Sequence, residues 1–380
     1  MTQDCKRILA VVGTRPEVIK MAPVVHALRQ TRWADVRVLA TAQHREMLDE
    51  ALAVFGITPD IDLNIMLPQQ SLPELTARLL RALDEVITAE TPDAIIVQGD
   101  TTTVMAVALA AFYRQIPLGH VEAGLRSGNL YSPFPEEMNR TVAGHLSRWH
   151  FAPTKGAEAN LLREGIAPDR IHVTGNTVID ALLEVASRAA LPSLLKVPAG
   201  ARMILLTAHR REHFGAPLAE IFRAVRDLAD ARDDVCFIYP VHPNPNVKEA
   251  AFRLLGDHPR ILLCAPIEYV SFVALMKRAY LIITDSGGVQ EEAPALGKPV
   301  VVTRRETERP EAVTAGVAML VGPDYDALIS VVGRLLDEPL FYARMAVGAS
   351  PYGDGAAAGR IVSVLQKDLF GKAKDAASIP

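Results

Sequence analysis

The sequence predicts an α/β protein built from two doubly wound, Rossmann-like domains, each with a parallel sheet covered by helices on both faces. Two observations support this prediction. Short apolar runs typical of buried strands alternate with helix-length segments along the chain, and the alternation restarts after a Pro- and Gly-containing stretch at 191–200. Polar residues also follow the strands, at the edge where open parallel sheets bind ligands. We therefore expect the strand ends of the two domains to face one cleft.

In the first half, strands are expected at 7–12, 36–40, 94–97 and 117–121, with short strands near 150 and 171. Helices are expected directly after the first strand and at about 45–55, 72–90, 101–113 and 136–147. In the second half, a helix is expected up to about residue 190, and strands are expected at 203–207, 235–239, 261–263, 281–284, 299–303 and 317–321. The predicted domains are therefore 1–175, joined by a C-terminal helix at 356–370, and 176–355.

Composition excludes several classes of protein. A net charge of −4 gives no overall basic character, so nucleic acid is not an expected partner. The three cysteines are widely spaced and form no CxxC pair, which is typical of reduced cysteines in a cytoplasmic protein. The first residues are too weakly apolar for a signal peptide, and no run approaches the roughly 20 apolar residues of a membrane span.

The most informative stretch is 279–302, which reads AYLIITDSGGVQEEAPALGKPVVV. It predicts a strand, a tight glycine turn, a helix and a second strand. Ser286 is expected to cap this helix, while Gly287 and Gly288 would let an anion approach the first backbone N–H groups. Glu292, about 6 Å further along the helix, is placed to accept hydrogen bonds from a ribose diol. An ordinary βα turn with a solvated glutamate pair remains an equally open interpretation.

Other polar residues also stand at or near strand ends. They are Arg15, Lys20, Gln43, His44, Asp100, Glu122, His209 and His242. Each has a simpler structural explanation. Asp100 would serve only as a helix cap and Glu122 only as a partner of Arg126, and Glu136, further along the chain, would be only a first-turn helix carboxylate. Their joint occurrence on both predicted sheets is what favours a ligand site.

Several familiar motifs are missing. The first turn, GTRPE, is not the G-x-G-x-x-G of a dinucleotide site, and neither a P-loop nor a G-x-S-x-G turn occurs. The segment from His209 to His213 matches the H-x-x-E-H pattern of zinc enzymes. That chemistry needs both histidines on one helix face, whereas His209 ends a predicted strand, so we expect no metal site.

The chain closely resembles the non-hydrolysing UDP-N-acetylglucosamine 2-epimerases of bacteria. The matching segments run in family order from residue 13 to about 361: GTRPEVIKMAPVVHAL, TAQHREMLD, GDTTT, GHVEAGLRSG, SPFPEEMNR, HFAPT, VTGNTVIDAL, HRREHFG, YPVHPNPNV, TDSGGVQEEAPALGKPV, TERPEAVTAG and SPYGDGAAAGRI. The resemblance implies the two-domain fold of the B-type glycosyltransferases, a cytoplasmic homodimer, and interconversion of UDP-N-acetylglucosamine and UDP-N-acetylmannosamine for polysaccharide synthesis without cofactor or metal.

Residue roles follow from the same resemblance. It implies that Asp100, Glu122 and Glu136 are acid/base carboxylates and that His209 is an active-site histidine near the diphosphate. The residues implied to bind the UDP-sugar are Arg15, Lys20, Ser286, Gly287, Gly288, Glu292 and Arg309. Those associated with a second UDP-N-acetylglucosamine, an allosteric activator, are Gln43, His44, Arg210 and His242.

This sequence departs from the family at three positions. Gln98 stands where a His often precedes Gly-Asp, Ala208 stands where Gly often precedes His209, and Gln69 stands where some relatives have Arg. The expected reaction eliminates UDP to give 2-acetamidoglucal and then adds it back. A hydrolysing 2-epimerase, a B-type glycosyltransferase and a catalytically silent UDP-sugar sensor remain alternatives.

Overall fold

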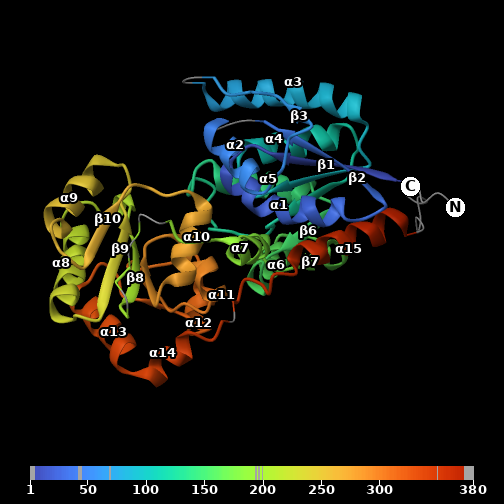
Figure 1. The fold of residues 1–380 in the computed structure, drawn as a ribbon. Coiled ribbons are helices and arrows are strands. Elements are labelled where there is room, and N and C mark those ends of the chain that lie inside the picture. The colour runs from blue at the N-terminus through green and yellow to red at the C-terminus, as the bar shows by residue number, and fades with distance from the viewer. Residues whose placement is uncertain are drawn as a thin grey trace. The chain divides into compact units, whose positions relative to one another are not determined.

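The computed structural model describes residues 5–41, 45–67, 70–192, 195, 197–198, 200–348 and 350–371. Contacts divide the chain into two compact units. Unit 1 comprises 1–181 and 355–380, and unit 2 comprises 182–354. The division falls inside helix α7 (Thr177–Arg188). Within the described residues, each unit contains one all-parallel sheet flanked by helices, as predicted (Figure 1).

The described strands of unit 1 form a sheet in the order β3-β2-β1-β4-β5-β6-β7. Their bounds are β1 Lys6–Val12, β2 Ala34–Ala40, β3 Ile61–Asp62, β4 Ala94–Gln98, β5 Leu118–Val121, β6 Trp149–Ala152 and β7 Ile171–Val173. The helices between them are α1 Arg15–Arg29, α2 Arg45–Val54, α3 Leu72–Glu90, α4 Thr102–Tyr113, α5 Glu136–Leu146 and α6 Lys155–Arg163. The order reverses at β1 and β4, and such a switch point is where open α/β sheets bind ligands.

The described strands of unit 2 are ordered β10-β9-β8-β11-β12-β13. Their bounds are β8 Arg202–Thr207, β9 Val235–Pro240, β10 Ile261–Cys264, β11 Leu281–Thr284, β12 Val300–Val302 and β13 Ala318–Leu320. The helices are α8 Ala216–Ala231, α9 Pro245–Leu255, α10 Tyr269–Arg278, α11 Gly287–Ala295, α12 Pro310–Thr314, α13 Tyr325–Asp337 and α14 Pro339–Met345. Here the order reverses at β8 and β11, so these two strands carry the second switch point.

Each unit has a hydrophobic core between its sheet and its helices. In unit 1, Leu9, Leu79 and Ile95 belong to one cluster of buried apolar residues, and in unit 2 Phe222 and Ile283 belong to another. The near-continuous apolar runs of the central strands reflect burial on both faces. The predicted strands, and the helices for which bounds were expected, therefore appear close to those bounds, whereas the two-residue β3 and helices α6, α13 and α14 were not predicted.

The first βα turn shows why GTRPE is not a dinucleotide motif. The Glu17 carboxylate lies inside the turn and accepts from the N–H groups of Gly13 at 2.6 Å and Thr14 at 2.7 Å. A Cβ on Gly13 would lie 2.4 Å from the Thr41 hydroxyl, so no larger residue fits. Burial raises the pKa of Glu17, and Thr101 donates a compensating hydrogen bond. This glutamate therefore ties the ends of β1 and β4 together.

The C-terminal helix α15 (Ala357–Phe370) packs along α1 in unit 1, as Figure 1 shows. The ring of Phe370 meets Trp33 edge-on, with 5.8 Å between ring centroids. The first N–H groups of α15, those of Ala357 and Ala358, donate to the Asp180 carboxylate. Apolar packing and a capped helix start thus fix α15 to the unit.

Candidate active site

Unit 1 gathers three of the predicted site residues at the carboxyl ends of its central strands. Asp100 follows β4, Glu122 follows β5, and Lys20 lies in the second turn of α1, after β1. Strands β4 and β5 are neighbours, with Gln98 paired to Val121, so the turns that follow them lie side by side. Lys20 bridges Glu122, with its Nζ 2.5 Å from Oε1 and 2.7 Å from Oε2. The structure therefore brings these residues together through sheet register.

The carboxylate of Asp100 is partly buried and pairs with a cationic side chain. Arg140 pairs with its Oδ2, and Asn139 donates to its backbone carbonyl at 2.9 Å. Burial raises the pKa of the Asp100 carboxyl, the Arg140 guanidinium opposes that rise, and the nearby Glu122 charge adds to it. A carboxyl with a raised pKa holds its proton closer to neutral pH, which suits an acid/base group.

Glu122 is not the partner of Arg126 considered above. Arg126 pairs instead with Glu164, at 2.6 Å, whereas Glu122 is held by Lys20, Gln98 and Asn176. Asp100 does not cap α4 either, because Thr101 occupies the N-cap position and accepts from Val104. Both structural alternatives for these carboxylates are therefore wrong.

Two further predicted residues of unit 1 are at helix starts. Arg15 is the first residue of α1, and Glu136 is the first residue of α5. Within the part of the chain that the structure describes, neither forms an ion pair. The neighbouring Glu137 is different, because it is buried, accepts from Ser127 N–H at 2.9 Å and lies 3.2 Å from Arg140 NH1. Sequence reasoning missed Glu137, since consecutive glutamates in a first helical turn look alike.

Unit 2 builds its cluster on β8 and β11, whose last residues pair with each other. His209 follows β8, and its Nδ1 lies 3.0 Å from Oδ1 of Asp285, which follows β11. Asp285 also accepts from the backbone N–H groups of His209 and Arg210. Burial favours the protonated form of Asp285, but His209, His213 and these backbone donors outweigh burial and lower its pKa. The ionised Asp285 therefore orients His209 so that Nε2 faces away from it.

The two histidines of the H-x-x-E-H pattern are not on one helix face. Both turn their Nδ1 atoms to Asp285, at 3.0 Å for His209 and 3.5 Å for His213. Among the described residues, no group of three His, Cys, Asp or Glu is arranged to hold a metal ion. The His242 ring stacks on His209, with 5.5 Å between centroids, and burial followed by the proximity of His209 lowers the pKa of His242.

The glycine turn leads into α11 as expected, with one correction. Ser286 occupies the N-cap position, but its side chain makes no cap hydrogen bond; the prediction of a serine cap was wrong in this respect. The backbone of Gly287 and Gly288 is unobstructed, since a Cβ on Gly287 would meet only the guanidinium of Arg309, at 4.0 Å. Arg309 pairs with the buried Glu291. An open helix start with a cation beside it favours anion binding.

Glu292 is on the buried side of α11. Its Oε1 accepts from the Tyr269 hydroxyl at 3.2 Å, and the residue is 7% exposed. Two predicted residues of the activator set, Gln43 and His44, and the departure Gln69 lie outside the described residues. Arg210, a third member, donates from Nε to the Asp285 carbonyl at 3.3 Å.

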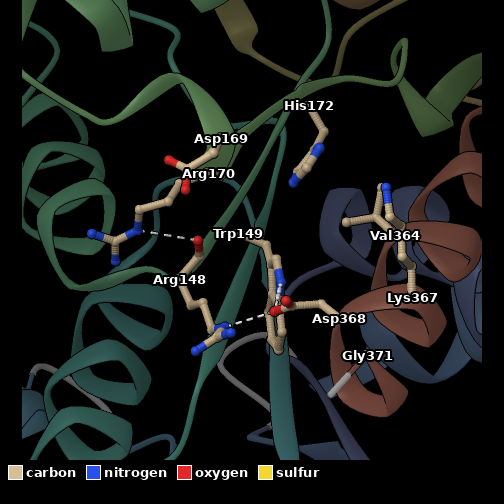
Figure 2. Close-up of a pocket in the computed structure, with 9 residues that line it drawn as sticks. All are labelled: Arg148, Trp149, Asp169, Arg170, His172, Val364, Lys367, Asp368 and Gly371. Carbon is tan, nitrogen blue, oxygen red and sulfur yellow. Dashed lines mark hydrogen bonds and ion pairs between the residues drawn. The ribbon is translucent and has the colours of Figure 1, made fainter. Parts of the chain in front are cut away.

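The hollow shown in Figure 2 lies at the other edge of the unit 1 sheet. It has a volume of about 630 Å³, and its lining includes Arg148, Trp149, Arg170, His172 and Asp368. Trp149 starts β6, and Arg170 directly precedes β7, so this is the amino edge of the strands. Asp368 of α15 accepts at 2.8 Å from both Arg148 and Trp149. The Arg148 and Asp368 charges pair with each other. The hollow therefore lies where α15 packs against the sheet.

A buried carboxylate cluster in one unit and a glycine-led helix start in the other define a class of α/β enzyme that handles anionic ligands. The chain matches the family model described as UDP-N-acetylglucosamine 2-epimerase over residues 26–366. It is 52% identical to the UDP-N-acetylglucosamine 2-epimerase of Escherichia coli strain K12 over 371 residues, which cover 95% of this chain and 99% of that one.

Solved structures give the same result. The UDP-GlcNAc 2-epimerase of Neisseria meningitidis, bound to UDP-GlcNAc, is 47% identical with a TM-score of 0.85, covering 95% of this chain and 100% of that chain. The Methanocaldococcus jannaschii UDP-GlcNAc 2-epimerase, in complex with UDP-GlcNAc and UDP, is 34% identical with a TM-score of 0.74, covering 95% and 99%. This chain belongs to the UDP-N-acetylglucosamine 2-epimerase family, and it is an enzyme of the isomerase class. The predicted resemblance and fold class are confirmed.

Proposed function

We propose that this protein reversibly inverts C2 of UDP-N-acetylglucosamine to give UDP-N-acetylmannosamine without net hydrolysis. One observation carries the chemistry: Asp100 and Glu122, carboxylates from adjacent strand ends, lie close enough for the charge of Glu122 to raise the pKa of Asp100. Inversion at C2 needs a proton removed from one face and another delivered to the opposite face. Two carboxylates in different surroundings suit those two tasks.

The proposed route goes through 2-acetamidoglucal, because the C2 proton is not adjacent to a carbonyl and is hard to remove directly. A carboxylate takes the C2 proton, the C1–O bond to UDP breaks with its electron pair leaving on the diphosphate, and a C1–C2 double bond forms. UDP then adds back at C1 while C2 receives a proton on its other face. Atoms and charge balance without a nicotinamide or a metal ion. Asp100, Glu122 and Glu136 are the proposed acid/base groups.

The leaving UDP needs positive charge and N–H donors. In unit 2 we assign the diphosphate to His209, Ser286 and the open N–H groups of Gly287 and Gly288, with Arg309 beside them. The Arg309 guanidinium lies 4.0 Å from the position that a Cβ on Gly287 would take, which supports this assignment. Glu292 is proposed for the ribose, and Arg15 and Lys20 of unit 1 for the sugar-phosphate end of the substrate.

We also propose a homodimer that binds a second UDP-N-acetylglucosamine as an activator. Helices α3 and α4 pack together and leave Phe112 and Tyr113 at 59% and 69% exposure, which favours a protein contact. Arg210 and His242, together with Gln43 and His44, are proposed for the activator. Light scattering on the purified protein tests the dimer, and sigmoidal kinetics that become hyperbolic in Arg210→Ala test the activator.

A cytoplasmic location is proposed on the state of the thiols. Cys5, Cys236 and Cys264 are all free, which is typical of proteins kept in a reducing compartment. No helix among the described residues is long and apolar enough to cross a membrane.

The decisive experiment is proton NMR of UDP-N-acetylglucosamine incubated with the protein in D2O without nicotinamide or metal. The proposal predicts UDP-N-acetylmannosamine, with deuterium at C2 of both nucleotide sugars, because each passage through the glycal exchanges that proton with solvent. Free N-acetylmannosamine and UDP would indicate a hydrolysing enzyme instead. An unchanged spectrum would contradict the proposal and favour a transferase or a sensor.

A further inference from the structure

Glu122 is surrounded by hydrogen-bond donors to an unusual degree. Lys20 Nζ contacts both carboxylate oxygens, Asn176 Nδ2 donates to Oε1 at 3.1 Å, and Gln98 Nε2 donates to Oε2. Gln98 and Asn176 are 3% and 2% exposed, so both amides are removed from bulk water. Lys20 of α1, Gln98 of β4 and Asn176, which directly precedes α7, therefore converge on one carboxylate.

The number of contacts matters. An ionised carboxylate offers about four acceptor positions, two on each oxygen. Lys20 contributes two contacts, and the two amides contribute one each, so the described residues already supply a donor for every position. A carboxylate in this state has no lone pair available for a proton from a substrate carbon. Glu122 can act as a base only after one donor leaves.

The three donors differ in how readily they can move. Lys20 has a charge and a flexible four-carbon stem, and it lies on a helix near the predicted phosphate end. Asn176 is fixed, because its Oδ1 accepts from the N–H of Val178 at 3.1 Å, which directs its Nδ2 at Glu122. Gln98 is the last residue of β4, held in the sheet by its neighbour β5. Lys20 is thus the mobile donor, and the amides are the stationary ones.

The backbone conformation of Glu122 also bears on the role of its hydrogen-bond donors. Its φ is +63°, a left-handed conformation that is strained for a residue with a Cβ. The carboxylate contacts Gln98 at the end of β4. Without donors on both oxygens, nothing in the strained turn itself would select one orientation of the carboxylate.

We propose that Gln98 and Asn176 form an amide clamp, two positioning residues that hold Glu122 ionised and oriented while Lys20 leaves it for the substrate. This inference rests on the proposed epimerase function, and it assigns a role to Gln98, a position at which this chain departs from its family. A neutral amide donates at every pH, so the orientation of Glu122 does not depend on whether its neighbour is protonated.

The test removes the Gln98 donor while keeping the size of the side chain. In Gln98→Met we expect kcat for epimerisation to fall roughly 10- to 100-fold, because a misoriented base loses much of its effect. KM and the Kd for UDP should stay within about twofold, since the proposed role of Gln98 is to hold Glu122 and not the nucleotide. The acid limb of the kcat/KM profile should move to higher pH, because a donor favouring the charged carboxylate is gone.

Controls separate this role from a structural one. Gln366→Met, on the exposed face of α15, makes the same chemical change away from the site and should leave kcat, KM and the pH profile unchanged. Gln98→His restores an N–H donor and should recover most of the turnover at neutral pH. If thermal unfolding shows that Gln98→Met does not fold, the smaller Gln98→Leu takes its place.

The outcomes are distinguishable. An active wild type together with a Gln98→Met variant of unchanged kcat and pH profile overturns the amide clamp and leaves the epimerase proposal intact. If Gln98→Met instead raises KM or weakens the affinity for UDP, the amide clamp is also overturned, since Gln98 would then contribute to substrate binding. A wild type that produces no deuterium exchange at C2 overturns both proposals.

Discussion

At the scale of single residues, the chemistry of this protein depends on buried polar side chains whose partners define their charge. Asp285 is ionised because two histidines and two backbone N–H groups surround it, and it thereby orients His209. Glu17 is the opposite case, a carboxylate whose pKa is raised by burial. The same side-chain chemistry thus gives opposite charge preferences in different surroundings.

His120 in β5 offers a test of such burial through pH. Its Nε2–H donates to the Gly99 carbonyl at 2.7 Å, and its Nδ1 is buried with no hydrogen-bond partner among the described residues. Burial lowers the pKa of His120 to about 4. Between the folded pKa and the unfolded value near 6.5, the unfolded chain binds the proton more tightly, so the free energy of unfolding decreases as pH falls through that window.

We expect His120→Gln, which keeps an N–H donor but cannot titrate, to remove this contribution. The decrease in unfolding free energy between pH 7 and pH 4 should be smaller in the variant by up to roughly 3 kcal/mol. Urea titrations of both proteins at pH 7, 5.5 and 4 measure this difference. Parallel pH dependences in the two proteins would contradict the assignment of a neutral buried imidazole.

At the scale of elements, close backbone contacts hold the turn that carries Glu122. Gly124 follows β5 with φ +90°, and a Cβ there would lie 2.4 Å from the Ala157 carbonyl oxygen in α6. The contact is with backbone, which cannot rotate out of the way. Helix α6, which was not predicted from the sequence, therefore sets the shape of the turn beside the carboxylate cluster.

Gly124→Ala is expected to lower the free energy of unfolding by roughly 2–4 kcal/mol, because the left-handed conformation and the steric clash both oppose it. Gly128→Ala is the matched control. Gly128 also has a left-handed φ, +79°, but its Cβ would meet nothing within 4 Å, so only the conformational cost of about 1 kcal/mol remains. Thermal unfolding of the two variants gives the comparison, and equal losses would show that the contact with α6 is unimportant.

At the scale of the whole molecule, the proposed proton-transfer residues and the proposed diphosphate-binding residues belong to different units. The carboxylates belong to unit 1, and the proposed diphosphate residues His209, Ser286 and Gly287 belong to unit 2. Substitutions in unit 2 should therefore abolish UDP binding, and substitutions in unit 1 should abolish proton transfer, independently of each other. The family model matches residues 26–366, so it covers most of both units.

We expect Asp100→Asn, Glu122→Gln and Glu136→Gln each to reduce epimerisation at least 100-fold while UDP still raises the unfolding temperature as in the wild type. Gly287→Val should do the converse and abolish the UDP-dependent rise, because its side chain would cover the N–H groups at the start of α11. Differential scanning calorimetry with and without UDP, paired with turnover assays, measures both effects. Near-normal turnover in all three carboxylate variants would contradict the acid/base assignment.

The amino-acid sequence alone was enough to predict the alternation of strands and helices, the two parallel sheets and the position of the glycine turn before α11. These features have local causes: apolar runs of strand length, helical periodicity and the conformational freedom of Gly287 and Gly288. The strand pattern also placed Asp100 and Glu122 directly after strands, and the family resemblance implied their acid/base roles. Such patterns are readable because each is complete within a few neighbouring residues.

The partners of those residues, in contrast, became known from the three-dimensional fold. Lys20 and Asn176 reach Glu122 from 102 and 54 positions away in the chain, and His209 meets Asp285 across 76 residues. The pairing of Glu122 with Arg126, which looked reasonable from their spacing, does not occur. Parallel strands are joined by long crossovers, so the neighbours at a strand end depend on sheet order and register, and neither is encoded in any local stretch of sequence.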